Sequence, residues 1–343
     1  MAATSLLMPL YAGRFRGVDA IVGCNQPSAW IAWWAARLID VPYVVYLNQP
    51  NRLVYPRSID RETGWVTNAD YRLLAAVVMR ATRFVAWADR RSVQEADQLL
   101  VNGDYIGDII RNTYRRDAVD CPAGCHVAAS GFPLPIEARF TGGLTINGYP
   151  IRRPYALLTN RHYPQKRFDL AIKAMAEVRK KHPRVQLVVP GPATVHTAEL
   201  RALVTKLDLS EAVLFLGAIS EEELQRLYET AAVYVYPAPE EDFGMGVIES
   251  MAKGVPVVAW NQAGPTVTVR PGTGHLAEPL DVSDYAQGIS KLLGDPAGNQ
   301  ATGERGFEWA RTFDWDRHID TLERAVLEVA RSHERISSEA ATA

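Results

Sequence analysis

The sequence contains few cysteines, no lysine before residue 150 and no long apolar run. Its three cysteines, Cys24, Cys121 and Cys125, are too few for the disulfide framework of a small secreted protein. No stretch approaches the roughly 18 consecutive apolar residues that indicate a membrane-spanning helix. The first residues also lack the basic lead and the cleavage site of a signal peptide. We therefore expect a cytoplasmic protein.

The net charge is also small. The 343 residues carry a net charge of −2, with 48% apolar and 22% charged residues, which is typical of globular proteins and, at this length, of two domains. This balance argues against a nucleic-acid partner. Residues 1–150 hold 15 Arg against 13 acidic residues, a balance of +2, and the remainder holds 22 basic against 26 acidic residues, a balance of −4. The front half could therefore make a peripheral contact with a membrane or an anionic acceptor.

Two of the cysteines lie in the segment Cys121-Pro-Ala-Gly-Cys125-His126, which superficially resembles a metal or haem site. The spacing fits neither common pattern, and no second pair of ligands follows. We therefore predict no metal site and expect an interdomain loop here.

Three tryptophans, Trp30, Trp33 and Trp34, lie in one predicted helix. Trp30 and Trp34 are separated by one helical turn and share a face. Two interpretations remain open: packing in the core, or contact with a membrane or a partner protein.

Strand and helix patterns alternate along the chain, which indicates parallel α/β layers. In the front half we expect strands at 18–24, 41–47 and 84–88, helices at 28–39, 71–81 and 92–100, a long loop at 48–70 that is either functional or disordered, and a linker at 118–150. In the back half we expect strands at 155–160, 185–189, 213–216, 233–236 and 255–259, and helices at 168–181, 197–206, 221–230, 281–293, 303–312 and 316–334.

The most informative segment contains Glu241 and Glu249, eight positions apart. It follows an apolar run, 233–237, that is typical of a buried strand, and Glu249 lies on the helix predicted after it. Both carboxylates would face the carboxyl edge of a parallel sheet, where open α/β folds bind nucleotides. The loop 243–245 would place backbone N–H groups at a helix N-terminus, which suits a phosphate. The segment therefore predicts a site for a polyol beside a phosphate.

The string Glu-x-Phe-Gly, then Glu249, then Ala252-x-Gly254-x-Pro256-Val257-Val258 closely resembles the signature of retaining GT-B glycosyltransferases of family 4, which includes many mannosyltransferases and glucosyltransferases. The resemblance implies an α/β fold of two Rossmann-like domains facing a cleft, the N-terminal one incomplete. It implies an acceptor-side domain over 1–148, a nucleotide-sugar domain over 149–315 and a C-terminal helix, 316–343, that crosses back to the first domain.

The same resemblance implies an activity. A hexose of mannose or glucose type would pass from a nucleotide-diphosphate sugar to a glycan or a lipid-linked acceptor, with retention of configuration. The family needs neither a metal nor a cofactor, so the resemblance implies none here.

The resemblance also assigns roles to a basic segment after the first strand of the back half. Asn160-Arg161 and Lys166 match the family's Gly-Arg-x-x-x-x-Lys-Gly, in which Arg and Lys hold the diphosphate. The departing diphosphate gains negative charge, so fixed cations beside it would stabilise the transition state. Glu249 would bind the ribose hydroxyls, and Glu241 would lie near the reacting face of the sugar.

Shorter matches extend this site. The N–H groups of Phe243, Gly244 and Met245 would meet the sugar or the phosphate. Gly217, at the end of a predicted strand, matches the segment that contacts the nucleobase. Asn48 stands where the family often has a histidine near the sugar. Its amide can bond a hydroxyl but cannot act as a base near neutral pH.

Two departures from the family keep other functions open. Its opening strand, Gly-rich loop and helix have no match before 18–24, and the further Glu often found beside the segment matching 261–265 is Val267 here. We expect a second copy, a partner subunit or a membrane to cover the short domain. The alternatives to a transferase are a degenerate sugar-nucleotide-binding subunit that supports a partner transferase, and a nucleotide-sugar hydrolase or epimerase.

Overall fold

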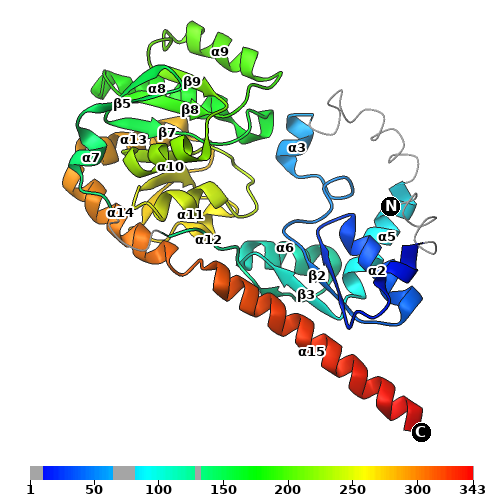
Figure 1. Ribbon diagram of the computed structural model, residues 1–343. Coiled ribbons are helices and arrows are strands. Elements are labelled where there is room, and N and C mark those ends of the chain that lie inside the picture. Colours follow the sequence, from blue (N-terminus) through cyan, green and yellow to red (C-terminus); the bar gives the residue numbers. More distant parts are fainter. Residues whose placement is uncertain (1–10, 65–81, 128–132, 343) are drawn as a thin grey trace. The chain divides into compact units, whose positions relative to one another are not determined.

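The computed structural model describes residues 11–64, 82–127 and 133–342, which form two compact units. The first unit comprises Met1–Gly124 together with Trp315–Ala343, and the second comprises Cys125–Asp314. Figure 1 shows each unit as parallel strands covered by helices. The division lies at Gly124, whereas the sequence placed it at residue 148.

The first unit is built on a four-stranded parallel sheet with the order β1-β2-β3-β4. Its strands are β1 (Ile21–Cys24), β2 (Tyr43–Tyr46), β3 (Gln98–Val101) and β4 (Val119–Asp120). Its described helices are η1 (Ala12–Phe15), α2 (Ser28–Ile39), α3 (Ser58–Glu62), α5 (Thr82–Gln94), α6 (Asp104–Tyr114) and α15 (Trp315–Thr342). Neighbouring residues of a strand point to opposite faces, so Val45 joins the apolar cluster of α2 and α6 while Val44 packs with residues of α15.

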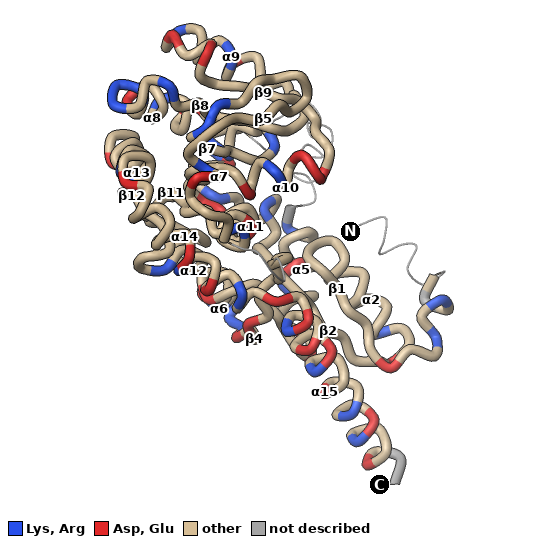
Figure 2. Tube along the Cα trace, turned by 60° about the vertical axis from the view of Figure 1, so that its left-hand side comes forward, with Lys and Arg blue, Asp and Glu red and all other residues tan. Residues whose placement is uncertain are grey.

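The long helix α15 brings the end of the chain onto the sheet of the first unit. Ala325 and Val329 are buried there together with Val44 and Leu100. Figure 2 shows basic and acidic residues along the rest of this helix, as expected for an amphipathic helix with one solvated face. None of the helices in the described part of the chain is long and apolar enough to cross a bilayer.

The region around α5 differs from the sequence prediction. The strand predicted at 84–88 and the helix predicted at 92–100 are wrong, because α5 continues to Gln94 and β3 follows it. The helix predicted at 71–81 lies outside the described residues. The buried positions of α5 have the spacing of one helix face: Val85, Ala88, Asp89, Ser92 and Val93. The run Phe-Val-Ala-Trp-Ala has the composition of a strand, and the helical period shows only over the following two turns.

The tryptophans of α2 belong to the core of the first unit. Trp30 is fully buried, and its ring stacks on that of Trp33 with 4.6 Å between centroids. Trp33 Nε1 donates a hydrogen bond of 2.7 Å to Glu95 Oε2. The core-packing interpretation therefore holds for Trp30 and Trp33.

The second unit is built on a six-stranded parallel sheet with the order β12-β11-β10-β7-β8-β9. Its strands are β7 (Tyr155–Leu157), β8 (Gln186–Pro190), β9 (Val213–Gly217), β10 (Val233–Tyr236), β11 (Val257–Trp260) and β12 (Gly274–Ala277). Its helices are η4 (Pro164–Lys166), α7 (Glu137–Phe140), α8 (Phe168–Lys181), α9 (Thr197–Lys206), α10 (Glu221–Thr230), α11 (Met245–Met251), α12 (Pro265–Thr268), α13 (Val282–Gly294) and α14 (Pro296–Ala310). In this doubly wound arrangement ligands bind where the strand order reverses, here between β7 and β10.

The predicted linker 118–150 instead contains ordered structure. Within it and just beyond, β5 (Gly143–Ile146) and β6 (Tyr149–Arg152) form an antiparallel hairpin. Asn147 Nδ2 donates to Leu216 O at 2.7 Å, and Arg152 N donates to Gln186 Oε1 at 2.7 Å. These bonds fix the hairpin to β8 and β9. The hairpin, which begins at Gly143, therefore belongs to the second unit and not to a linker.

Candidate functional site

A pocket of about 440 Å³ lies in the second unit, at the carboxyl ends of β7, β8, β9 and β10. It therefore occupies the edge, and the switch point, at which this class of sheet binds nucleotides. Its lining combines small residues, aromatic hydroxyls, one guanidinium and one carboxylate: Thr159, Asn160, Arg161, Pro190, Gly191, Pro192, Ala218, Ile219, Leu224, Tyr228, Tyr234, Tyr236, Gly246 and Glu249.

Arg161 brings a positive charge to this pocket from the loop after β7. Its backbone N donates to Asn160 Oδ1 at 2.9 Å, so Asn160 shapes the turn that carries the guanidinium. Gly191 lies beside this turn with φ +126°, and a Cβ there would lie 3.1 Å from Asn160 O. The Arg161 side chain is exposed and takes part in no ion pair within the described ranges. It is therefore available to an anionic ligand.

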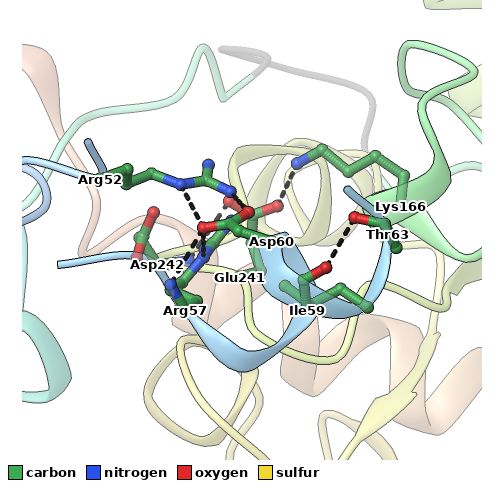
Figure 3. Close-up of polar contacts among 8 residues, drawn as sticks. All are labelled: Arg52, Arg57, Ile59, Asp60, Thr63, Lys166, Glu241 and Asp242. Atoms are coloured by element: carbon green, nitrogen blue, oxygen red, sulfur yellow. Dashed lines mark hydrogen bonds and ion pairs between the residues drawn. The ribbon is translucent and has the colours of Figure 1, made fainter. Parts of the chain in front are cut away.

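Lys166 and Glu241 form an ion pair (Figure 3). Their side chains are 21% and 16% exposed, and neither residue lines the 440 Å³ pocket. The next cation, Arg167, has a left-handed φ of 49°, and its Nε lies 2.9 Å from Asp169 Oδ1. The structure therefore places Arg161 at the pocket, pairs Lys166 with Glu241, and ties Arg167 to Asp169.

Glu249 points its carboxylate into the pocket from α11. Tyr228 OH donates to Glu249 Oε2 at 3.1 Å. Burial raises the pKa of Glu249, and the bond from Tyr228 partly opposes this by stabilising the ionised form. Of the two glutamates in the motif, the pocket thus holds Glu249, while Glu241 lies with Lys166.

The two glycines between the glutamates, Gly244 and Gly246, are required for different structural reasons. Gly244 adopts φ +93° as the residue that caps α11, a conformation that favours glycine. At Gly246 a Cβ would lie only 2.2 Å from the Tyr234 hydroxyl oxygen. Phe243 is buried, with its ring centroid 5.8 Å from that of Phe313. The predicted contacts at Phe243, Gly244 and Met245 are therefore not part of the pocket wall, and Gly246 is.

The segment 261–265, which sequence reasoning left without a role, supports the Glu241 loop. Gly264 N donates to Glu241 O at 2.7 Å. A Cβ on Gly264 would lie 2.6 Å from Phe243 N, so only glycine allows this close approach.

Gly217 lies beside the pocket rather than in its wall. It has φ +73°, and its carbonyl accepts from Gly191 N at 2.8 Å. The wall itself continues with the next two residues, Ala218 and Ile219. Sequence reasoning also missed Thr159, just past the end of β7, Tyr228 on α10 and Tyr234 on β10. Only Thr159 carried a signal, as a polar side chain just past a strand end.

Asn48 belongs to the first unit. Its backbone N donates to Asn25 Oδ1 at 2.8 Å, so the loops after β1 and β2 are joined. In the following loop, Arg52 Nε donates to the fully buried Asp60 at 2.8 Å, and Asp60 also accepts from Arg57 N at 3.1 Å (Figure 3). This buried carboxylate orders the front of the stretch 48–70 that was expected to be a functional loop.

The suspected metal motif has other contacts. Cys121 Sγ lies 3.4 Å from His318 Nδ1 of α15, and Cys125 Sγ donates to Ala310 O at 3.6 Å. Each thiol is buried, and burial raises the pKa of Cys121 to about 11 and that of Cys125 to about 12. Both therefore remain thiols near neutral pH.

Comparison with known proteins agrees with this geometry. Residues 146–309 match the family described as "Glycosyl transferases group 1". These residues belong to the group 1 glycosyl transferases. The match covers the pocket and both motif glutamates, and it confirms the resemblance read from the sequence.

Several similar proteins share one name. The "D-inositol 3-phosphate glycosyltransferase" of Acidothermus cellulolyticus is 36% identical over 185 residues, which are 51% of this chain and 41% of that protein. The protein of the same name from Streptomyces scabiei is 26% identical over 348 residues, which are 97% of this chain and 73% of that protein. The chain spans about half the length of the first relatives, 41% and 57% for the Acidothermus and Streptomyces bingchenggensis proteins.

Solved structures establish the fold. The sucrose-phosphate synthase of Thermosynechococcus elongatus superposes with a TM-score of 0.68 at 20% identity, covering 98% of this chain and 80% of that one. The Anabaena protein HepE, solved in complex with UDP and glucose, gives 0.71 at 18% identity, covering 94% and 82%. The chain therefore has the GT-B fold that the sequence predicted.

Proposed function

We propose that this chain is a retaining glycosyltransferase that moves a hexose from a nucleotide-diphosphate sugar to an acceptor hydroxyl. The observation that carries the proposal is the pairing of Arg161 and Glu249 in one pocket at the switch point of the second sheet. A guanidinium suits a diphosphate, and a carboxylate suits the two hydroxyls of a ribose. The nucleotide of the donor carries both a diphosphate and a ribose, so it can bind both side chains.

Lys166 and Glu241 act next to this pocket. Donor binding brings a diphosphate that competes with Glu241 for the ammonium of Lys166, because both ligands are anions. Once Lys166 turns to the diphosphate, Glu241 is released toward the sugar. Breaking this one ion pair therefore frees both the Lys166 ammonium for the diphosphate and the Glu241 carboxylate for the sugar.

Sugar transfer then follows the front-face route that the family resemblance implies. The bond between the anomeric carbon and the phosphate oxygen breaks, and the acceptor oxygen bonds to the same face of that carbon. The acceptor's proton passes to the leaving phosphate oxygen. Arg161 and Lys166 stabilise the charge that develops on this diphosphate, so the reaction needs no metal and no cofactor.

The first unit supplies the acceptor side. We propose a glycan or a lipid-linked glycan as the acceptor, with the Asn48 amide bonding one of its hydroxyls. The names of the relatives add a phosphorylated cyclic polyol as a second acceptor class to be tested. Peripheral membrane contact and a second copy or partner subunit on the first unit remain part of the proposal.

Two rival functions differ from this one in a measurable way. A supporting subunit would bind the nucleotide sugar without turning it over, and a hydrolase would release free sugar without an acceptor. Arg161 and Glu249 in one pocket, with Lys166 and Glu241 poised beside it, favour the transferase.

The test begins with a thermal-shift panel of UDP, GDP, ADP and their sugars, followed by a transfer assay with the best donor and a panel of glycan, lipid-linked and polyol-phosphate acceptors. We expect stabilisation by one nucleotide series and sugar transfer to one acceptor class. The variants Arg161→Ala and Glu249→Ala should show a smaller thermal shift than the wild type. A wild type that no nucleotide stabilises, or that releases only free sugar, would contradict the proposal.

A further inference from the structure

Three hydroxyl groups and one carboxylate at the pocket form an unbroken chain of hydrogen bonds. Tyr234 OH lies 2.8 Å from Thr159 Oγ1, which lies 2.7 Å from Tyr228 OH. Tyr228 OH lies 3.1 Å from Glu249 Oε2. All four side chains line the pocket, and they come from four different segments: the end of β7, α10, β10 and α11. These hydrogen bonds between side chains thus connect four segments of the pocket lining, in addition to the backbone hydrogen bonds of the sheet.

Counting protons fixes the direction of this chain. Each hydroxyl carries one proton, and an ionised carboxylate can only accept. Tyr228 must therefore donate to Glu249. Its oxygen is then left to accept from Thr159, and Thr159 in turn accepts from Tyr234. Every donor in the chain points toward Glu249.

Gly246 makes room for this arrangement. A Cβ at that position would lie 2.2 Å from Tyr234 OH and 3.4 Å from Tyr228 OH. The two tyrosines are almost fully buried, at 0% and 3% exposure. Buried hydroxyls need hydrogen-bond partners, and the hydrogen-bond chain provides partners for both tyrosine hydroxyls.

We propose that Tyr228, Thr159 and Tyr234 are positioning residues, which hold the Glu249 carboxylate in place to receive a vicinal diol of the donor. The identity of that ligand rests on the proposed function. Tyr228 occupies one acceptor direction of Oε2, and the remaining lone pairs of the carboxylate can accept two ligand hydroxyls. A nucleotide that lacks one of the two hydroxyls should therefore bind less tightly.

The hydrogen bond from Tyr228 also favours the ionised form of Glu249. Burial raises the pKa of this carboxyl, and the Tyr228 bond opposes the rise. Deleting the Tyr228 hydroxyl should raise the pKa further. Deleting a more distant hydroxyl acts through one or two intervening bonds, so its effect should be smaller.

The first test uses the whole chain without ligand, labelled with ¹³C at the glutamate carboxyls and titrated by NMR. The Glu249 signal is assigned with Glu249→Gln. We expect its midpoint to rise most in Tyr228→Phe, less in Thr159→Val and least in Tyr234→Phe. Tyr155→Phe is the matched control, because Tyr155 is equally buried, donates to Leu227 O at 2.8 Å and does not line the pocket.

An unchanged Glu249 midpoint in Tyr228→Phe, or an equal change in Tyr155→Phe, would overturn the proposal. If Tyr228→Phe does not fold, Thr159→Val and Tyr234→Phe decide, since both keep the two aromatic rings. If the Glu249 midpoint in both variants equals that of the wild type, the proposed positioning role of the hydrogen-bond chain is rejected.

The second test compares UDP with 2′-deoxy-UDP by calorimetry. We expect the wild type to prefer UDP by about 10-fold, and this preference to fall by about threefold or more in Tyr228→Phe but not in Tyr155→Phe. Equal binding of the two nucleotides by the wild type would overturn the diol assignment. A wild type that binds neither would contradict the donor site for UDP, while the NMR titration would still decide on the positioning role.

Discussion

The carboxyl edges of the two sheets differ in chemistry. In the first unit, the residues directly after β1, β2 and β3 are mainly amides, such as Asn25, Gln26, Asn48 and Asn102. Further along the loop after β2, Arg52 and Arg57 pair with the buried Asp60. In the second unit, the loops after β7 and β10 carry Arg161, Lys166 and Glu241, with Glu249 on the next helix. Amides suit uncharged hydroxyls, whereas fixed charges suit a diphosphate.

One architecture thus presents two kinds of ligand-binding edge. In both units the central strands, β2 and β3 in the first and β7 and β10 in the second, are short, mainly apolar and largely buried. The ligand class is therefore decided by a few loop residues and not by the sheet.

The largest effect is expected at the two cations of the second unit. Arg161→Ala and Lys166→Ala should each weaken nucleoside-diphosphate binding by roughly 1.5–3 kcal/mol, about 10- to 100-fold. Lys173→Ala is the control, since Lys173 is exposed on α8 and bonds Asp169. Calorimetry that finds unchanged affinity in both test variants would remove the phosphate site.

The two glutamates should separate binding from turnover. Glu249→Ala should lower nucleotide affinity by about 1 to 2 kcal/mol, because it loses hydrogen bonds to a charged acceptor. Glu241→Ala should leave affinity equal or higher, since Lys166 loses its competing partner, and should mainly lower the turnover. Equal losses of affinity in the two variants, measured by calorimetry, would contradict this division.

A second buried carboxyl of the first unit, that of Asp89, should make the stability of the protein depend on pH. Burial raises the pKa of Asp89 to about 6, although Tyr114 OH donates to it at 2.9 Å. Because the folded pKa lies above the unfolded value, Asp89 contributes most stability below about pH 4 and loses it as the pH rises through about 6. The shift of about two units corresponds to at most about 3 kcal/mol, and we expect roughly half.

Asp89→Asn should therefore reduce the loss of stability between pH 4 and pH 7, as measured by urea unfolding of the whole chain. Asp169→Asn is a control of opposite sign. Burial alone would raise the pKa of Asp169, but bonds from Arg167 and Lys173 outweigh it and lower the pKa, so this residue stabilises at higher pH. An Asp89→Asn profile parallel to that of the wild type would refute the assignment.

The smallest effect is expected from metal removal. Sugar transfer should survive EDTA, because Arg161 and Lys166 provide the positive charge that a divalent ion supplies elsewhere. The Asp-x-Asp segment, Asp314-Trp315-Asp316, lies at the start of α15 and not at the pocket. Loss of transfer on chelation, restored by a divalent ion, would show that these cations do not suffice.

Sequence reasoning located the second unit better than the first. The helices α8, α9 and α10 begin and end as expected because their apolar spacing is regular and caps or a His-Pro pair mark the ends. In the first unit, α5 was divided into a strand and part of a helix, since its first residues are aromatic and branched. Local composition competes with the helical period there, and the burial that resolves it depends on residues distant in sequence.

The charged residues of the site could be predicted from the sequence. Arg161 and Glu249 follow from the motif and reach the pocket, whereas the Lys166–Glu241 pair joins loops 75 residues apart and needs the fold to be seen. Tyr228, Thr159 and Tyr234 were missed because strand and helix tyrosines are typical of a core. Only their mutual distances identify them as one chain.

The most direct test of the donor site is a crystal structure of the chain with a bound nucleoside diphosphate. The account predicts the diphosphate within hydrogen-bond distance of the Arg161 guanidinium and the Lys166 ammonium, with the ribose hydroxyls on Glu249. Lys166 should then have left Glu241. A nucleotide bound outside the 440 Å³ pocket, or one bound there with its ribose away from Glu249, would contradict it.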